Sequence, residues 1–172
     1  MTSKLINQLC LIFFISLFLG CKSEKNYSSK NPNIIIIYTD DLGYGDVSAY
    51  SKGTLNTPNI DKLANEGIRF NNGYASSATC SPSRYALLTG TYPWRKTDLR
   101  VITGGSLVID TTEITIPKIL KNKGYHTGIV GKWHLGLGSG DGVAGSGIID
   151  YNSYISPGPN QVGFDYSHIM PD

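Results

Sequence analysis

The chain carries at Asn33-Ile34-Ile35-Ile36-Ile37-Tyr38 an uninterrupted apolar run rich in β-branched residues, and two aspartates, Asp40 and Asp41, follow it closely. A continuous run of this kind suits a β-strand that is covered on both faces, as in the parallel sheet of an α/β protein. Open α/β sheets place their functional sites at the carboxyl ends of their strands. The stretch therefore predicts both a buried strand and a site at its end.

Helical segments alternate with short strands after this run. Three segments begin with serine or threonine closely followed by proline and end at glycine, a pattern typical of short helices. These predicted helices run from Thr57 to Gly67, from Ser81 to Gly90 and from Thr115 to Gly124. Strands are expected at 68–70 and 125–130. The alternation predicts a three-layer α/β/α sandwich with a mostly parallel central sheet.

The N-terminal residues have the features of an export signal. Lys4 supplies a positive charge, and the segment Leu9–Leu19 is almost wholly apolar but too short to span a bilayer. The spacing in Phe18-Leu19-Gly20-Cys21 resembles a bacterial lipobox. We expect a signal peptide at 1–20, lipidation of Cys21 and a tether at 21–32, which describes an exported bacterial lipoprotein of the periplasm or outer-membrane surface. An ordinary secretory signal and a short anchor helix are the alternatives.

Cysteine usage and charge narrow the class of protein. Of three cysteines, Cys10 lies in the predicted signal peptide and Cys21 at its cleavage site, so Cys80 is the lone free thiol of the expected mature domain and cannot form a disulfide within it. The formal net charge is +2, with no basic stripe along the chain. Nucleic-acid binding therefore has no support, and the question becomes what the lone thiol does.

The residues around this cysteine form a distinctive pattern. Cys80-Ser81-Pro82-Ser83-Arg84 places proline two residues and arginine four residues after the cysteine, and an apolar segment runs on to Gly90. A second segment, Gly124–His134, includes Gly131-Lys132-Trp133-His134. Together they resemble the two signatures of the type I, formylglycine-dependent sulfatases of the alkaline phosphatase superfamily. The resemblance covers about 33–166.

The resemblance implies a chemistry for Cys80. In that family a maturation enzyme reads the unfolded chain and oxidises the cysteine to formylglycine, an aldehyde that hydrates to a diol. One hydroxyl attacks sulfur and releases the alcohol, and the second allows sulfate to leave, which is covalent catalysis. The family assigns the remaining roles as follows: orientation of the diol to Arg84, sulfate binding and catalysis to Lys132 and His134, and calcium ligation to Asp40, Asp41 and the oxidised Cys80.

The residue types suit these roles. If Ser81 caps a helix, Cys80 lies just outside its N-terminus, where free N–H groups favour an anion. Adjacent carboxylates suit a hard divalent cation. Lys132 and His134 share one face if the backbone stays extended, which would leave Trp133 for packing.

The resemblance also predicts that this chain is incomplete. The family completes its calcium site with an Asp–Asn pair, and adds another histidine and lysine, far downstream of the matched motifs. We therefore expect 33–172 to be the N-terminal part of a catalytic domain, truncated before the C-terminal subdomain and inactive alone. Three functions stay open: an arylsulfatase-like sulfuric ester hydrolase acting on sulfated glycans, a phosphonate or phosphate monoester hydrolase, and an inactive lipid-anchored fragment.

Overall fold

The computed structural model describes residues 31–51, 55–96, 99–101, 104–139 and 149–171. They divide into a short unit, Met1–Thr39, and a larger one, Asp40–Asp172. The predicted signal peptide, Cys21 and nearly all of the predicted tether lie outside the described residues. Within the described ranges, no helix is both long and apolar enough to cross a membrane.

The strand predicted at 33–38 is wrong for this structure. These residues of the short unit have no regular secondary structure, and their isoleucines are exposed, with 83% of Ile35 and 79% of Ile37 accessible. A β-branched sequence favours an extended backbone, but a strand also needs a hydrogen-bonded neighbour. Both described strands belong to the larger unit and pair only with each other.

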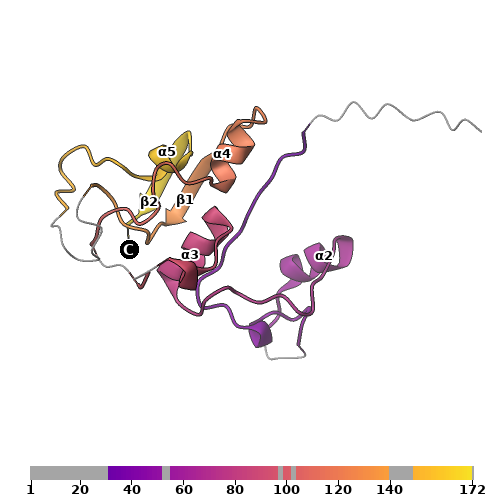
Figure 1. Ribbon diagram of the computed structural model, residues 1–172. Coiled ribbons are helices and arrows are strands. Elements are labelled where there is room, and N and C mark those ends of the chain that lie inside the picture. The colour runs from indigo at the N-terminus through magenta and orange to yellow at the C-terminus, as the bar shows by residue number, and fades with distance from the viewer. Residues whose placement is uncertain (1–30, 52–54, 97–98, 102–103, 140–148, 172) are drawn as a thin grey trace, which may run out of the picture. The chain divides into compact units, whose positions relative to one another are not determined.

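All the helices and strands of the described residues belong to the larger unit (Figure 1). They are η1 (Tyr44–Asp46), α2 (Pro58–Glu66), α3 (Cys80–Thr89), η2 (Pro93–Arg95), α4 (Ile116–Lys121), β1 (Gly128–Lys132), α5 (Pro159–Val162) and β2 (Tyr166–Met170). Three of these helices match the sequence prediction in place. The predicted strand at 68–70 is wrong, because those residues are exposed and irregular.

The start of α3 differs from the prediction in a way that matters for the site. Thr79 is its N-cap residue and Cys80 is its first helical residue, so Ser81 lies inside the helix rather than capping it. The Ser83 N–H donates to the Thr79 carbonyl at 3.1 Å. Cys80 therefore belongs to the first turn, where backbone N–H groups have no partner within the helix. The end of α3 is as predicted, with Gly90 in the left-handed conformation.

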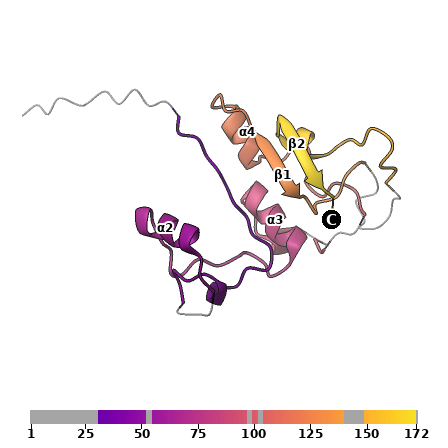
Figure 2. The same ribbon diagram turned by 180° about the vertical axis from the view of Figure 1, so that it is seen from behind.

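The two strands form a parallel pair, as the α/β prediction requires. Gly128 of β1 aligns with Tyr166 of β2, and Lys132 aligns with Met170. The view from behind shows both arrows running side by side in the same direction (Figure 2). β1 occupies 128–132 rather than the predicted 125–130, so Lys132 is its last residue.

The hydrophobic core lies under α3 and one face of this sheet. Its buried members come from α3, from α5 and from the segments before and after β1: Tyr85, Ile109, Trp133, Leu135, Leu137 and Val162. Ile129 of β1 and Ile169 of β2 pack against this cluster. Val130, the residue after Ile129 in β1, is 73% exposed. Alternation along β1 thus covers one face of the two-stranded sheet.

Candidate active site

Lys132 brings the lone thiol and a carboxylate together. Its ammonium nitrogen Nζ lies 3.5 Å from Cys80 Sγ and 2.8 Å from Asp40 Oδ2. Cys80 is the first residue of α3, and Lys132 is the last residue of β1. The helix and the strand therefore deliver two predicted site residues, separated by 52 positions in sequence, to one point.

Arg84 ties the same elements together from one turn further along α3. Its Nη1 donates to the Lys132 carbonyl at 2.6 Å, and its Nη2 lies 3.4 Å from Asp40 Oδ2. Only 13% of the Arg84 side chain is exposed. The guanidinium therefore fixes the backbone of Lys132 as well as the carboxylate that Lys132 contacts, which one planar group with several donors can do.

The charges in this cluster reinforce each other. The hydrogen bond from Lys132 holds the pKa of Asp40 below its usual value; desolvation opposes this effect, and the charges of Lys132 and Arg84 add to it. The hydrogen bond to Asp40 in turn raises the pKa of Lys132. Asp40 and Lys132 are therefore both ionised near neutral pH. Two cations around one carboxylate leave an excess of positive charge beside Cys80, which favours an anionic ligand.

The helix adds to this positive environment. α3 has 10 residues, and Cys80 stands at its N-terminal end. The N–H groups of a first turn and the positive end of the helix dipole attract anions. Because α3 begins at Cys80 rather than after Ser81, Cys80 lies within this first turn.

His134 reaches its position by leaving the strand. Its φ of 52° is in the left-handed region, so the extended backbone that would place Lys132 and His134 on one face is not present. Its side chain is buried, and its Nδ1 has no hydrogen-bond partner among the described residues. Trp133 is buried in the core, as predicted, with its indole N–H donating to the Gly136 carbonyl at 2.7 Å.

The predicted calcium ligands do not form a metal cluster in the described part of the chain. No group of three His, Cys, Asp or Glu side chains lies close enough together to hold an ion there. Asp40 contacts Lys132 and Arg84, whereas Asp41 is exposed with a φ of 57° and makes no hydrogen bond or ion pair within the described ranges. Two carboxylates and one sulfur are too few for calcium, which takes about six to eight oxygens.

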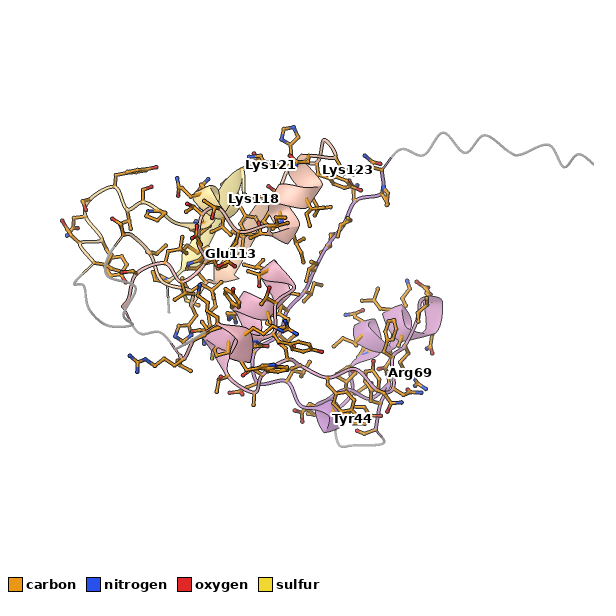
Figure 3. The ribbon with its side chains drawn as sticks, in the orientation of Figure 1. Tyr44, Arg69, Glu113, Lys118, Lys121 and Lys123 are labelled. Carbon is orange, nitrogen blue, oxygen red and sulfur yellow. The ribbon has the colours of Figure 1, made fainter. Side chains whose placement is uncertain are left out.

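Glu113 supports the site and was missed by the sequence analysis. The Tyr85 hydroxyl donates to Glu113 Oε2 at 2.9 Å, and Lys96 Nζ lies 3.4 Å from Glu113 Oε1. Lys118 of α4 donates to the Glu113 carbonyl at 2.8 Å, and both residues are labelled in Figure 3. Glu113 thus connects α3, through Tyr85, to α4, through Lys118. The available signal was the spacing Asp110-x-x-Glu113, since Glu113 Oε1 accepts from the Asp110 N–H as in a capping turn.

Gly136 was also missed, and it fixes the segment that follows His134. A Cβ added there would lie 2.0 Å from the Ser106 carbonyl oxygen, and the φ of 74° disfavours other residues. Two neighbouring backbone bonds hold this crossing, from Leu137 N–H to Gly105 O and from Val108 N–H to Leu135 O. Only a glycine allows two chain segments to approach this closely.

Comparisons with known proteins identify the family of this chain. The sulfatase family model matches residues 32–168. N-Acetylgalactosamine-6-O-sulfatase of Bacteroides thetaiotaomicron is 46% identical over 162 residues, which is 91% of this chain and 30% of that protein. Human steryl-sulfatase is 43% identical over 131 residues, covering 72% of this chain and 22% of that protein. The chain thus spans less than a third of the length of either relative.

Solved structures extend the agreement to the fold. A structure connected with glycosaminoglycan metabolism by Bacteroides thetaiotaomicron superposes with a TM-score of 0.75 at 49% identity, covering 83% of this chain and 28% of that one. A complex with the substrate D-glucosamine-2-N,6-O-disulfate gives a TM-score of 0.52 at 42% identity, covering 60% of this chain and 20% of that one. The α/β architecture with a parallel sheet is thereby confirmed. A family match across most of the chain, together with these similarities, shows that this chain belongs to the sulfatase family.

Proposed function

We propose that the protein containing this chain hydrolyses sulfate monoesters and that Cys80, converted to formylglycine, is its nucleophile. One observation carries the proposal: the Lys132 ammonium lies 3.5 Å from Cys80 Sγ at the N-terminus of α3. A cation and a helix N-terminus beside one side chain suit the attack on a negatively charged ester.

Formylglycine at position 80 would supply the hydroxyl nucleophile and the means of expelling sulfate. The unmodified residues around it have separate tasks. Lys132 faces Cys80 directly and binds a sulfate oxygen as a point charge. Arg84 keeps the Lys132 backbone and Asp40 in place. His134 has a buried Nδ1 with no partner in the described part of the chain, which suits a group that exchanges a proton with the departing alcohol.

Calcium is expected from the family, and Asp40 and Asp41 would be its ligands in this chain. The described residues supply too few donors, and Asp40 is bound to Lys132 and Arg84. We therefore assign no catalytic step to the ion. The ligands that this chain would contribute to the ion are these two carboxylates and the modified residue at 80.

Sulfated glycans are the proposed substrates. The named relatives support this choice, because one acts on N-acetylgalactosamine 6-sulfate groups and one is solved with a disulfated glucosamine. Exposed aromatic side chains at the start of η2 are compatible with a sugar-binding protein: the rings of the N-cap residue Tyr92 and of Trp94 stack with centroids 4.1 Å apart, and these residues are 54% and 69% exposed.

The proposed location is the periplasm or the outer-membrane surface of a bacterium, with a lipid on Cys21. The basis is the lipobox-like sequence Phe18-Leu19-Gly20-Cys21. Since the maturation enzyme reads an unfolded chain, Cys80 is expected to be oxidised before export. Metabolic labelling with a radioactive fatty acid tests the anchor: label is expected in the wild type and absent from Cys21→Ser. Label retained in that variant would disprove lipidation at this position.

Hydrolysis in the full-length protein tests the function. After coexpression with a formylglycine-generating enzyme, we expect release of inorganic sulfate from an aryl sulfate and from N-acetylgalactosamine 6-sulfate. Cys80→Ala should abolish both while leaving the circular dichroism spectrum unchanged. The alternative function, hydrolysis of phosphonate or phosphate monoesters, is tested with a phosphonate monoester as the substrate. Faster hydrolysis of that compound than of the sulfate esters would favour the alternative. Sulfate release by Cys80→Ala at the wild-type rate would exclude Cys80 as the nucleophile.

A further inference from the structure

Asp40 has a role in this structure that ligation of an ion does not explain. Its Oδ2 atom receives both Lys132 Nζ at 2.8 Å and Arg84 Nη2 at 3.4 Å. The neighbouring Asp41, with the same side chain and the same expected part in calcium binding, contacts neither cation. The two aspartates therefore differ in what they can do for Cys80.

We infer that Asp40 is a positioning residue whose carboxylate holds the Lys132 ammonium against the side chain at position 80. Lys132 has a long, flexible side chain with four methylenes, so the end of β1 alone does not determine where its ammonium lies. The ion pair with Asp40 selects the conformer in which Nζ also reaches Cys80 Sγ. Arg84 completes the arrangement by holding Asp40 Oδ2 and the Lys132 carbonyl with one guanidinium.

The consequence for catalysis rests on the proposed function, whereas the geometry does not. If position 80 carries the nucleophile, Asp40 keeps a cation at the place where the sulfate anion must bind. The pair is only partly shielded from water, since 26% of the Lys132 side chain and 43% of the Asp40 side chain are exposed. Removing the carboxylate should therefore loosen Lys132 without unfolding the chain.

Ortho-phthalaldehyde tests the position of Lys132 in the unmodified, metal-free chain. This reagent joins an amine and an adjacent thiol into an isoindole, whereas an amine without a nearby thiol gives a phthalimidine. The measured quantity is the fraction of modified Lys132 that is joined to Cys80, obtained by peptide mass spectrometry. Because it is a ratio of two products at one amine, it does not depend on how reactive that amine is.

The wild type and Asp41→Asn should give the same high isoindole fraction. Asp40→Asn should lower it by about threefold, the change expected when a partly exposed ion pair is lost. Asp40→Glu, which keeps the carboxylate, should recover part of the fraction. Equal fractions in Asp40→Asn and Asp41→Asn would overturn the inference, and so would a fraction in Asp40→Asn that matches the wild type.

Salt provides a test that needs no substitution. Since ions screen partly exposed pairs, molar sodium chloride should lower the isoindole fraction of the wild type. A fraction that does not change with salt would also overturn the inference, even if Asp40→Asn failed to fold. Sulfate hydrolysis is not used in either test. A chain that keeps Lys132 at Cys80 but fails to hydrolyse sulfate esters would disprove the proposed function and leave the role of Asp40 intact.

Discussion

Arg84 and Tyr85 are neighbours in α3, yet they belong to two different regions of the molecule. Arg84 faces a polar cluster with Asp40 and Lys132, whereas Tyr85 is only 3% exposed and lies in the hydrophobic core. At the end of β1, Lys132 and Trp133 divide in the same way. At both places, therefore, one residue lies at the site and the residue after it lies in the core.

The difference between these regions shows how the site is kept in place. The polar cluster is partly exposed, and partly exposed ion pairs contribute little to folding. The core residues are fully buried and supply the free energy that fixes α3 and β1. We conclude that the core positions the backbone and that the polar contacts only select side-chain conformers. Substitutions in each region separate the contribution of the core from that of the polar contacts.

Trp133→Ala should have the largest effect. Trp133 is 1% exposed, and the loss of a fully buried tryptophan costs about 3–5 kcal/mol of unfolding free energy. Urea denaturation followed by circular dichroism measures it. Trp94 is the matched control, since it is 69% exposed, and Trp94→Ala should change the free energy by less than about 0.5 kcal/mol. Equal losses in the two variants would contradict the division into core and surface.

Gly136→Ala should come next. The added Cβ would lie 2.0 Å from the Ser106 carbonyl oxygen, so the crossing behind His134 must open. We expect a loss of about 3 kcal/mol from the combined overlap and strain. Gly124→Ala is the control, because Gly124 also has a positive φ of 82° but no atom within 4 Å of the added Cβ. It should cost about 1 kcal/mol. A larger loss at Gly124 would mean that the close approach is unimportant.

Tyr85→Phe should have an intermediate effect that depends on pH. The hydroxyl donates to Glu113 at 2.9 Å, and the loss of such a bond to a charged group costs about 2 kcal/mol. Burial, followed by this bond, raises the pKa of Tyr85 to about 12 from 10.0. The raised value means that the unfolded chain releases the proton first. The contribution of Tyr85 is therefore complete below pH 10 and is lost as the pH rises through about 12.

Chemical denaturation at several pH values checks this prediction. The difference in unfolding free energy between wild type and Tyr85→Phe should shrink between pH 10 and pH 12. A constant difference across that range would show that Tyr85 titrates normally in the folded protein.

Lys132→Met should have the smallest effect on stability and the most local one. The Lys132 side chain is 26% exposed, and its contacts are polar. The melting temperature should therefore change less than in Trp133→Ala, Gly136→Ala or Tyr85→Phe, while the isoindole at Cys80 disappears together with the Lys132 amine. A melting temperature as low as that of Trp133→Ala would show that the polar cluster also holds the fold.

The sequence predicts the fold class and the meeting of three motif residues better than it predicts the individual strands. Cys80, Arg84 and Lys132 meet as expected, because their motifs lie at the ends of a helix and a strand whose local signals are strong. The isoleucine strand at 33–38 fails, because a strand depends on a neighbour that no local pattern specifies. The left-handed backbone of His134 could not be read from the sequence either, because no local pattern specifies it.

The role of Asp40 was predicted only in part. Its place at the site follows from the sequence, but its contacts with Lys132 and Arg84 depend on side-chain packing across 92 and 44 positions. Glu113 was missed because its contact with α3 also spans a long stretch of sequence: Tyr85 is 28 positions away. Motifs identify the residue types of a site, and tertiary structure decides which of them contact each other.

The most direct test of the central claim is the mass of the tryptic peptide 70–84, which contains Cys80. The chain is coexpressed with an active formylglycine-generating enzyme, and the same chain produced without that enzyme is the control. We predict the mass of formylglycine in the first sample and of cysteine in the second. An unmodified Cys80 in the presence of an enzyme that converts a known sulfatase peptide would contradict the claim that this residue is the precursor of the nucleophile.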